Sequence, residues 1–560
     1  MTIQKFGPSS LLAAFFLSGL MQISAAQTLP DAAQVKAYAE QLLDEQKLPA
    51  DGPGVALLVA RGDQLLYRGA RGMASIELGV PLSPDQVFRI GSVTKQFAAA
   101  TLLKLIDEGR AKLDDPLSKF LPDYPKGDTI TLAALLNHSS GVKSYTGIPG
   151  YMGNPVRREL STAELVAEFK NQPSDFAPGS GWRYNNSGYV LVGAVIEAIT
   201  GKSWHQALDE SLLRPNKLSG ISYPGETRVI KGMVSGYGFD PKLGVVGDGL
   251  ISMTQPHAAG ALVADVDSLW RWNLALHGGT MISPTSYARM TSPEGTAVAS
   301  RYGYGIAVGS LRGQPRLDHG GGINGFVSSL AWLPDGKVSV VMLRNTTGPG
   351  FNMDLVSRKL GAFVIGRPYP AIKPVAVAAE SLKALEGVFA LDTQQTRTLS
   401  LRGGQLFSTR SGGQPSLLVP VGADQFAFAD SVARLQIERA ADGKVSALKL
   451  FQDGDGAGEV WTRSADLPAQ VAISLTTEQQ LALIGDYASD QLQIKIFKDA
   501  QGGLRGQIVG QPDFELKASS PAQLYLTAVD AKLDFELLQG RAVQVTLLQG
   551  PARMVMKRQS

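Results

Sequence analysis

The segment SVTKQFAAATLLKLIDEG, residues 92–109, predicts a helix. Its large apolar side chains recur at helical spacing, alanines fill the middle, and Gly109 stands where a helix commonly ends. The apolar face consists of Val93, Phe97, Leu102, Leu105 and Ile106. Ser92 and Lys95 are three residues apart in the first turn, so the amine can reach the hydroxyl. The free N–H groups of a helix start would stabilise an alkoxide or a developing oxyanion. Without other motifs, an N-cap serine followed by an exposed lysine would be the simpler interpretation.

A second group of polar residues lies in FAPGSGWRYNNSGYVLVGAVIEAITG, residues 176–201. Tyr184 and Asn186 follow a Pro-Gly turn and directly precede a predicted helix. A tyrosine held beside a lysine can relay a proton, which gives Tyr184 a candidate role next to Lys95. Taken alone, the segment is equally well explained by a core tyrosine and a capping asparagine.

The third group is LDHGGGINGF, residues 317–326, where His319, Gly320 and Gly321 stand at the entry to a predicted strand pair. Glycines at such a place allow a substrate backbone to approach the strand closely. Taken alone, a glycine-flanked histidine is more typical of a turn than of a catalyst.

Strands are predicted before and after the mixed region of helices and loops that extends to about residue 290. They form two hairpins with short polar turns. The hairpin strands cover residues 54–60, 65–69, 326–333 and 337–344, a further strand is predicted at 316–318, and helices are predicted at 32–46 and 352–364. Strands at both ends with helices between them predict an α+β fold. It would be an antiparallel sheet assembled from N- and C-terminal strands, with a helical subdomain beside it.

The composition changes at the proline-rich linker GRPYPAIKP, residues 366–374, beyond which short alternating strands dominate. Three motifs occur there twice, at offsets of 95 to 98 residues. LEGVFALD at 385–392 matches LIGDYASD at 483–490, GQP at 413–415 matches GQP at 510–512, and EVWTR ending at Arg463 matches MVMKR ending at Arg558. The repeats predict a duplicated β unit of about 80–90 residues that forms a small antiparallel barrel. The expected domains are therefore 27–368, 375–468 and 473–560.

Composition excludes several classes of chemistry. The 560 residues predict several domains, at roughly 150 residues each. With 53 basic and 50 acidic residues, the net charge of +3 does not indicate a nucleic-acid or membrane-surface partner. The absence of cysteine removes thiol nucleophiles, thiolate zinc sites and disulfides. The five histidines are widely spaced, and no metal or organic cofactor is implied. Chemistry must therefore come from Ser, Lys, Tyr, carboxylates or a lone His.

The first 26 residues are expected to be a cleaved signal peptide. Lys5 supplies a positive charge, residues 11–23 (LLAAFFLSGLMQI) form a short apolar stretch, and Ser24-Ala25-Ala26 provides a cleavage site before Gln27. The mature chain would then lie in a periplasm or outside the cell, with no stable membrane span. The alternative is an N-terminal membrane anchor.

In their order along the chain, the three motifs resemble those of the serine β-lactamase and penicillin-binding protein superfamily, of the class C and peptidase S12 type. That pattern is S-x-x-K, then Y-x-N or S-x-N, then K-T-G or H-x-G. The resemblance covers about residues 30–365. It includes the connecting segments LLNHSSGV at 135–142, AAGALVADVDSLWRW at 258–272, YGYGI at 302–306 and WLPDGKVSVVMLRN at 332–345.

The resemblance implies roles for these residues. Ser92 would be the nucleophile, and Lys95 and Tyr184 would share the general acid and base work. Asn186, His319 and Gly321 would help to hold the substrate. The oxyanion hole would consist of the backbone N–H groups of Ser92 and Gly322.

The two predicted barrels at 375–468 and 473–560 make the resemblance more specific. A catalytic domain followed by two lipocalin-like barrels is similar to bacterial D-aminopeptidase. In that case a loop at 510–516 would reach the active site and offer Asp513 to a substrate ammonium group. The alternatives are that Asp513 is an ordinary turn residue and that the barrels are accessory modules.

The resulting expectation is an exported serine hydrolase acting through an acyl-enzyme on a small peptide, amide or ester, with cell-wall peptides as one source. D-Aminopeptidase and D-Ala-D-Ala carboxypeptidase activities are the first candidates. A β-lactamase, a short-chain esterase, and a slow peptidoglycan- or β-lactam-binding protein remain as alternatives. The oligomeric state stays open.

Overall fold

The computed structural model describes residues 29–225, 227–466, 472–489, 492–508, 513–526, 531–549 and 552–559. The expected signal peptide, with its cleavage site before Gln27, and the second GQP motif at 510–512 lie outside these residues. No helix in the described ranges is both long enough and apolar enough to cross a membrane.

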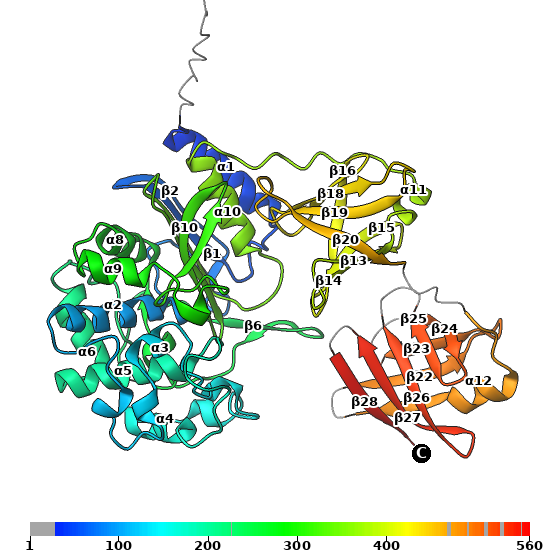
Figure 1. The fold of residues 1–560 in the computed structure, drawn as a ribbon, viewed down its shortest axis with the longest axis horizontal. Helices are drawn as coiled ribbons and strands as arrows, with labels where there is room; N and C mark the ends of the chain where they lie inside the picture. The colour runs from blue at the N-terminus through cyan, green and yellow to red at the C-terminus, as the bar shows by residue number, and fades with distance from the viewer. Residues whose placement is uncertain are drawn as a thin grey trace, which may run out of the picture.

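A six-stranded antiparallel sheet with the order β2-β1-β12-β11-β10-β9 forms the centre of the first part of the chain (Figure 1). Its strands are β1 (Val55–Arg61), β2 (Gln64–Arg71), β9 (Ala307–Leu311), β10 (Gln314–Ile323), β11 (Phe326–Leu333) and β12 (Val338–Arg344). Strand β1 pairs with β12, so that Val55 lies opposite Arg344 and Arg61 lies opposite Val338. The predicted sheet of N- and C-terminal strands is therefore confirmed.

Helices cover both faces of this sheet, which explains the unbroken apolar run in β1. Val55, Leu57 and Val59 pack in one core with helices α1 (Ala32–Glu45) and α10 (Met353–Val364). The alternate residues of the same strand face a larger core that includes α2 (Thr94–Asp107) and α8 (Val266–His277). Successive strand residues point to opposite faces, so a strand that is buried on both faces needs apolar residues throughout.

The helical region lies between β2 and β9 in the chain. Its other helices are α3 (Leu132–Leu136), α4 (Thr162–Phe169), α5 (Asn186–Thr200), α6 (Trp204–Leu208), α7 (His257–Gly260) and α9 (Pro284–Met290). Its short strands are β3 (Met73–Ser75), β4 (Val80–Pro81), β5 (Phe88–Arg89), β6 (Tyr237–Asp240), β7 (Gly244–Gly247) and β8 (Val263–Ala264). Helix α2 is buried on nearly all sides, and the Phe97 ring stacks on Trp272 with centroids 3.8 Å apart. The predicted first turn of α2 is the short 3₁₀ turn η1 (Gly91–Val93).

The tail consists of two closed eight-stranded antiparallel barrels, which confirms the predicted duplication (Figure 1). The first barrel contains β13 (Gly387–Ala390), β14 (Thr396–Arg402), β15 (Gln405–Arg410), β16 (Ser416–Gly422), β17 (Gln425–Phe428), β18 (Arg434–Arg439), β19 (Val445–Phe451) and β20 (Glu459–Ala465). The second contains β21 (Gly485–Ala488), β22 (Gln493–Lys498), β23 (Leu504–Ile508), β24 (Phe514–Ser520), β25 (Gln523–Leu526), β26 (Lys532–Leu538), β27 (Arg541–Gln549) and β28 (Ala552–Arg558). Helices α11 (Ala379–Lys383) and α12 (Thr477–Leu483) precede them.

Two of the three repeated sequence motifs meet in space at the junction of the first and last strand of each barrel. The sets are Gly387, Phe389 and Arg463 in the first barrel, and Gly485, Tyr487 and Arg558 in the second. In each set the guanidinium lies over the aromatic ring, at 5.5 Å and 5.7 Å from its centroid. A Cβ atom on either glycine would come within 2.9 Å of that guanidinium. The repeated residues therefore form the same packing unit in both barrels.

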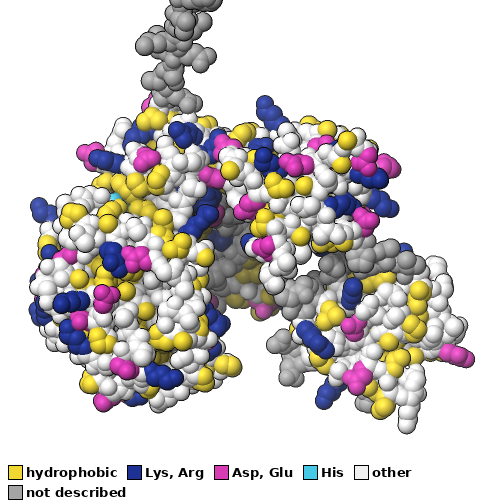
Figure 2. All heavy atoms as spheres, viewed as in Figure 1, with side chains coloured by type: hydrophobic (Ala, Val, Ile, Leu, Met, Phe, Trp, Pro, Cys, Tyr) yellow, Lys and Arg dark blue, Asp and Glu magenta, His cyan; other side chains and the backbone are white. Residues whose placement is uncertain are grey.

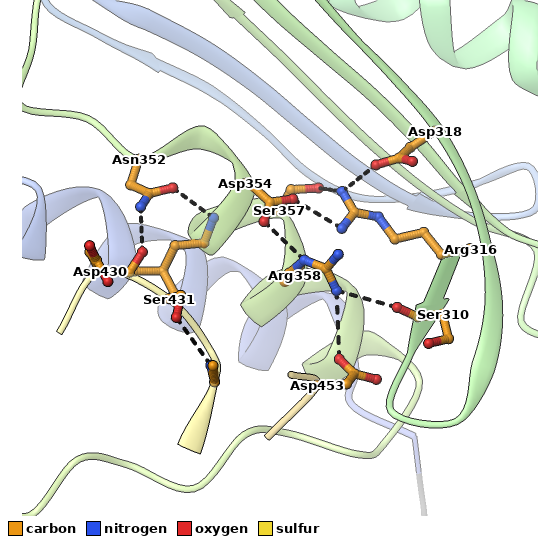
Figure 3. Close-up of polar contacts among 12 residues, drawn as sticks. Ser310, Arg316, Asp318, Asn352, Asp354, Ser357, Arg358, Asp430, Ser431 and Asp453 are labelled. Atoms are coloured by element: carbon orange, nitrogen blue, oxygen red, sulfur yellow. Dashed lines mark hydrogen bonds and ion pairs between the residues drawn. The ribbon is translucent and has the colours of Figure 1, made fainter. Parts of the chain in front are cut away.

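A chain of alternating charges joins β10 to the first barrel through α10 (Figure 3). Arg316 lies 2.9 Å from Asp318 and 3.1 Å from Asp354. Arg358 continues the chain, at 2.9 Å from Asp354 and 3.6 Å from Asp453 of the first barrel. The strand that carries His319 is thus connected to the barrel by ion pairs. Over the rest of the visible face, basic and acidic side chains are interspersed, in keeping with the small net charge (Figure 2).

Candidate active site

Ser92 lies in the turn η1, and strand β10 lies directly against this turn. A Cβ atom on Gly91 would be 3.0 Å from the backbone nitrogen of Gly322, and one on Gly321 would be 2.1 Å from the carbonyl oxygen of Ile90. The Ser328 hydroxyl donates a hydrogen bond to the same carbonyl at 2.7 Å. Glycine at position 321 is therefore required by contact with the protein's own turn, whereas Gly322 faces open space.

The amine of Lys95 is the centre of the site. Its Nζ atom lies 3.1 Å from Ser92 Oγ, 2.8 Å from Asn186 Oδ1 and 2.8 Å from the carbonyl oxygen of Ala259. The side chain is fully buried, and no ion pair to it is found among the described residues. The predicted approach of Lys95 to Ser92 across one helical turn is therefore present in the structure.

The environment of Lys95 favours a neutral amine. Burial lowers the pKa of Lys95 well below its usual range. A neutral amine has two protons and one lone pair. The oxygens of Asn186 and Ala259 can only accept hydrogen bonds from it, which leaves the lone pair for the hydroxyl proton of Ser92.

Tyr184 lies beside the lysine and the serine, with its ring centroid 4.7 Å from Lys95 Nζ. Burial raises the pKa of the Tyr184 phenol, and a hydrogen bond with Ser92 opposes part of that shift. The phenol is therefore protonated at neutral pH, so it can donate its proton and take another from a neighbouring group.

Asn186 contacts two protein groups through its side-chain amide. Its oxygen accepts from Lys95, and its Nδ2 atom donates to Thr146 Oγ1 at 3.1 Å. The preceding Asn185 is the N-cap of α5 and accepts from the backbone N–H of Gly188. Asn185 therefore caps the start of α5, and the adjacent Asn186 holds the amine of Lys95.

Both ring nitrogens of His319 form hydrogen bonds. Nδ1 lies 2.6 Å from the carbonyl oxygen of Gly320, which can only accept, so Nδ1 carries the proton. Nε2 then accepts from the Tyr302 hydroxyl at 2.7 Å. Burial lowers the pKa of His319 to about 4, so the ring is neutral. His319 is thus held rigidly in β10, and Tyr302 is its partner.

Sequence reasoning did not single out three residues near this centre. Tyr302 holds His319, the carbonyl of Ala259 holds Lys95, and the His138 ring packs 4.5 Å from Tyr184 between centroids. All three lie in segments that resemble family connecting segments, namely YGYGI, AAGALVADVDSLWRW and LLNHSSGV. Those segments were the available signal, although nothing in them indicated which residue would face the site.

One edge of β10 is open beside Ser92. The pairing of β10 with β9 ends at Asp318 opposite Ala307, while pairing with β11 continues to Ile323. In the described part of the chain, residues 319–323 therefore have no strand partner on the β9 side. Unpaired backbone groups at a strand edge can bind an extended peptide.

Two carboxylates could receive a cationic group, and they differ in their environment. Asp248 follows β7, and its Oδ2 atom is buried without a hydrogen-bond partner among the residues that the structure describes. Its neighbour Gly249 accepts a hydrogen bond from Asn324, in the turn after β10, at 2.8 Å. Asp513, the residue singled out in the sequence, forms an ion pair with Arg505 at the surface of the second barrel. The predicted loop at 510–516 is partly strand, because β24 begins at Phe514.

Within the described ranges, no three His, Cys, Asp or Glu side chains are grouped to hold a metal ion. The chemistry that the residues support is acyl transfer: a serine hydroxyl, a neutral amine that can take its proton, and a phenol that can return one. Backbone N–H groups at a turn that leads into a helix can stabilise the negative charge that develops on the attacked carbonyl oxygen.

Comparisons with known proteins agree with this chemistry. The Beta-lactamase family matches residues 37–362. The chain is 26% identical over 338 residues to a D-aminopeptidase of Gluconobacter oxydans, covering 58% of this chain and 61% of that relative's length. It is 28% identical over 347 residues to penicillin-binding protein 4 of Amycolatopsis lactamdurans, covering 58% and 89% of the two chains. The structure of a D-stereospecific amidohydrolase from Streptomyces sp. superposes with a TM-score of 0.51 at 28% identity, over 60% of this chain and 98% of the other.

Proposed function

The chain belongs to the beta-lactamase family of serine hydrolases, and from that premise we propose that it cleaves amide bonds at D-amino-acid residues of small peptides. The observation that carries the proposal is the buried Lys95 amine, which contacts Ser92 Oγ and two protein acceptors. The stereochemical preference is supported by the D-aminopeptidase and the D-stereospecific amidohydrolase, which this chain resembles over more than half of its length.

In the proposed mechanism, Ser92 attacks the substrate carbonyl carbon while its hydroxyl proton passes to Lys95. The backbone N–H groups of Ser92 and Gly322 stabilise the oxyanion. The C–N bond then breaks, and the leaving amine takes a proton from Lys95 through the Tyr184 phenol. Water attacks the acyl-enzyme, gives its proton to Lys95, and the acid product leaves as the proton returns to Ser92.

The other residues position this machinery. Asn186 holds Lys95 through its carbonyl oxygen, which is a positioning role in addition to the substrate contact implied by the family pattern. His319 and Tyr302 hold β10, and Gly321 lets that strand lie against the Ser92 turn. An extended substrate would bind along the edge of β10 that is not paired with β9, from His319 onward.

For an aminopeptidase, the substrate ammonium group needs an anion. Asp248 is the stronger candidate in the structure, because one of its carboxylate oxygens is buried with no hydrogen-bond partner among the described residues. Burial raises the pKa of Asp248, while a backbone hydrogen bond from Gly249 and the charge of Arg89 oppose part of that shift. A bound ammonium group would supply the missing partner. Asp513 remains the second candidate, although its ion pair with Arg505 already compensates its charge.

We further propose export of the chain after cleavage before Gln27, with domains at 27–368, 375–468 and 473–560. A cell-wall peptide is then an accessible substrate. The β-lactamase, carboxypeptidase, esterase and slow-binding alternatives share the acylation step and differ in the substrate and in the rate of deacylation.

A substrate screen tests the proposal. Purified protein is assayed with D-alanine p-nitroanilide, its L-enantiomer, an acyl-D-Ala-D-Ala peptide, a nitrocefin-type lactam and a p-nitrophenyl ester. We expect kcat/KM for the D-anilide to exceed that for the L-anilide by at least about tenfold, a ratio within reach of a shaped pocket. Equal rates for the two enantiomers, or turnover of the ester or the lactam alone, would overturn it.

A further inference from the structure

The interior of the first barrel contains a buried arginine that forms no ion pair with another described residue. Arg397 of β14 is 7% exposed, and no ion pair to it is found in the part of the chain that the structure describes. Its Nη1 atom donates to Ser408 Oγ at 2.8 Å, but its Nε atom is buried with no hydrogen-bond partner. A buried guanidinium with unfilled hydrogen-bonding capacity destabilises the fold unless another group compensates it.

Aromatic rings support this arginine without satisfying its N–H groups. The guanidinium carbon lies 5.0 Å from the ring centroid of Trp461 and 5.7 Å from that of Phe428. Contacts of this kind hold the cation in place through the negative faces of the rings. The Nε–H group therefore still has no acceptor among the described residues.

The arginine lines a pocket of about 290 Å³ on the barrel. Arg410, Ser408, Gln452 and Asp430 also line it, so that a second cation, one carboxylate and further hydrogen-bonding groups surround the same space. Burial and the charge of Arg410 lower the pKa of Arg397, and the charge of Glu459 opposes part of that shift. An anion in the pocket would relieve this repulsion.

The second barrel provides an internal comparison, because the two strand ladders can be matched through the repeated motifs. Leu399 pairs with Gly387 and Ser408, just as Ile496 pairs with Gly485 and Gly506. By this register the equivalents of Arg397, Ser408 and Trp461 are Ile494, Gly506 and Met556. Ile494 and Met556 are buried members of an ordinary apolar core. The same barrel position can therefore be filled by apolar residues, and the arginine of the first barrel is not a requirement of the fold.

We propose that the first barrel binds a small polar carboxylate, whose anionic group is received by Arg397. The planar guanidinium matches a carboxylate in shape and charge, and Arg410 adds a second cation at the pocket rim. The serine and glutamine side chains of the lining suit a polar ligand better than a hydrocarbon chain. This site is separate from Ser92 and does not depend on the proposed hydrolysis.

Isothermal titration of the full chain tests the proposal with N-acetylglycine and with N-acetylglycinamide, which differ only in the charged group. The acid is expected to bind and the amide is not. Arg397→Met should raise the Kd of the acid at least tenfold while hydrolysis of the best substrate at Ser92 is unchanged. Arg553→Gln, a change of an exposed arginine on the second barrel, is the matched control and should leave the Kd unchanged.

A second variant keeps the proposal testable if Arg397→Met does not fold, as judged by its thermal unfolding curve. Arg410 is exposed at the pocket rim, so Arg410→Gln should fold and should raise the Kd about threefold or more. Equal binding of acid and amide, or an unchanged Kd in the variants, would overturn the site. Inorganic phosphate serves as a third probe, and tighter binding of phosphate than of the acid would overturn the carboxylate assignment.

Discussion

The Nζ atom of Lys95 lies 3.1 Å from the Oγ atom of Ser92, and the amine is completely buried. The two other hydrogen-bond partners of this amine are neutral oxygens. The pair thus combines a potential nucleophile with a base that burial keeps uncharged. The predictions for Ser92, Lys95 and Tyr184 below concern this pair and the tyrosine beside it.

Ser92→Ala should abolish turnover of every accepted substrate, because the acyl-enzyme cannot form without the hydroxyl. The thermal unfolding temperature should stay close to that of the wild type, since the backbone of the turn is unchanged. Mass spectrometry after incubation with a penicillin or a phosphonate provides the direct measurement. A covalent adduct that persisted in the alanine variant would contradict the role of Ser92.

Lys95 should give the enzyme an acid limb in its pH profile. Its folded pKa is lowered well below 10.5, so kcat/KM should fall as the pH drops through that folded value and the base becomes protonated. The free energy of unfolding should also decrease as the pH drops through this range. Between the folded pKa and 10.5 the unfolded chain binds a proton that the native chain does not, so stability rises with pH.

Lys95→Met should remove the contribution of Lys95 to the pH dependence of stability. The difference in slope between wild type and variant should approach about 1.4 kcal/mol per pH unit within that interval. Urea unfolding of both proteins at several pH values gives the two slopes. Identical slopes would show that the amine is charged in the native state.

Tyr184→Phe should lower kcat by about 10²–10⁴, the usual contribution of general acid–base help. The reason is that the leaving amine loses the phenol proton next to Ser92. Tyr151→Phe is the control, because its hydroxyl binds the side chain of Gln255 instead. A Tyr184→Phe enzyme within threefold of wild type would exclude the role.

Asp248→Asn should raise KM for D-alanine p-nitroanilide by about tenfold, since a charge-assisted hydrogen bond contributes roughly 1.5–3 kcal/mol. The N-acetylated anilide has no ammonium group and should respond little. Asp513→Asn is measured in parallel with both substrates. If KM for the free amine rises only in the Asp513 variant, the residue that binds the ammonium group lies in the second barrel. If KM changes equally for both substrates, neither residue recognises the amine.

Export predicts a defined N-terminus. Mass spectrometry of protein recovered from the periplasm or the medium should find Gln27 as the first residue, since Ser24-Ala25-Ala26 provides the cleavage site. An intact Met1 on protein in the membrane fraction would favour the anchor instead.

Much of the fold could be predicted from local sequence patterns. The central hairpins and the terminal helices follow from apolar periodicity, and β1 and α10 were located to within one or two residues. The duplicated barrels were found because the glycine, aromatic and arginine residues that close each barrel recur at nearly constant spacing. Such features are readable because the physical requirement lies in the residue type itself.

The candidate site was predicted only as far as its side chains belong to motifs. The spacing of Ser92 and Lys95 within one helical turn determines their contact, and the structure contains it. The other partners of Lys95 could not be foreseen, because Ala259 contributes a backbone carbonyl, which every residue has. The hydrogen bond from Tyr302 to His319 likewise depends on how two segments pack.

Arg397 and Ile494 occupy equivalent positions in the two barrels, and they show the same difference between what sequence patterns predict and what depends on packing. The sequence by itself determined that two similar barrels follow the linker, because that depends on recurring residues. That one barrel buries a guanidinium where the other buries an isoleucine became clear only from the folded chain. The burial of a charge, and the lack of an ion pair to it among the described residues, are properties of the packed chain and are not encoded at any single position.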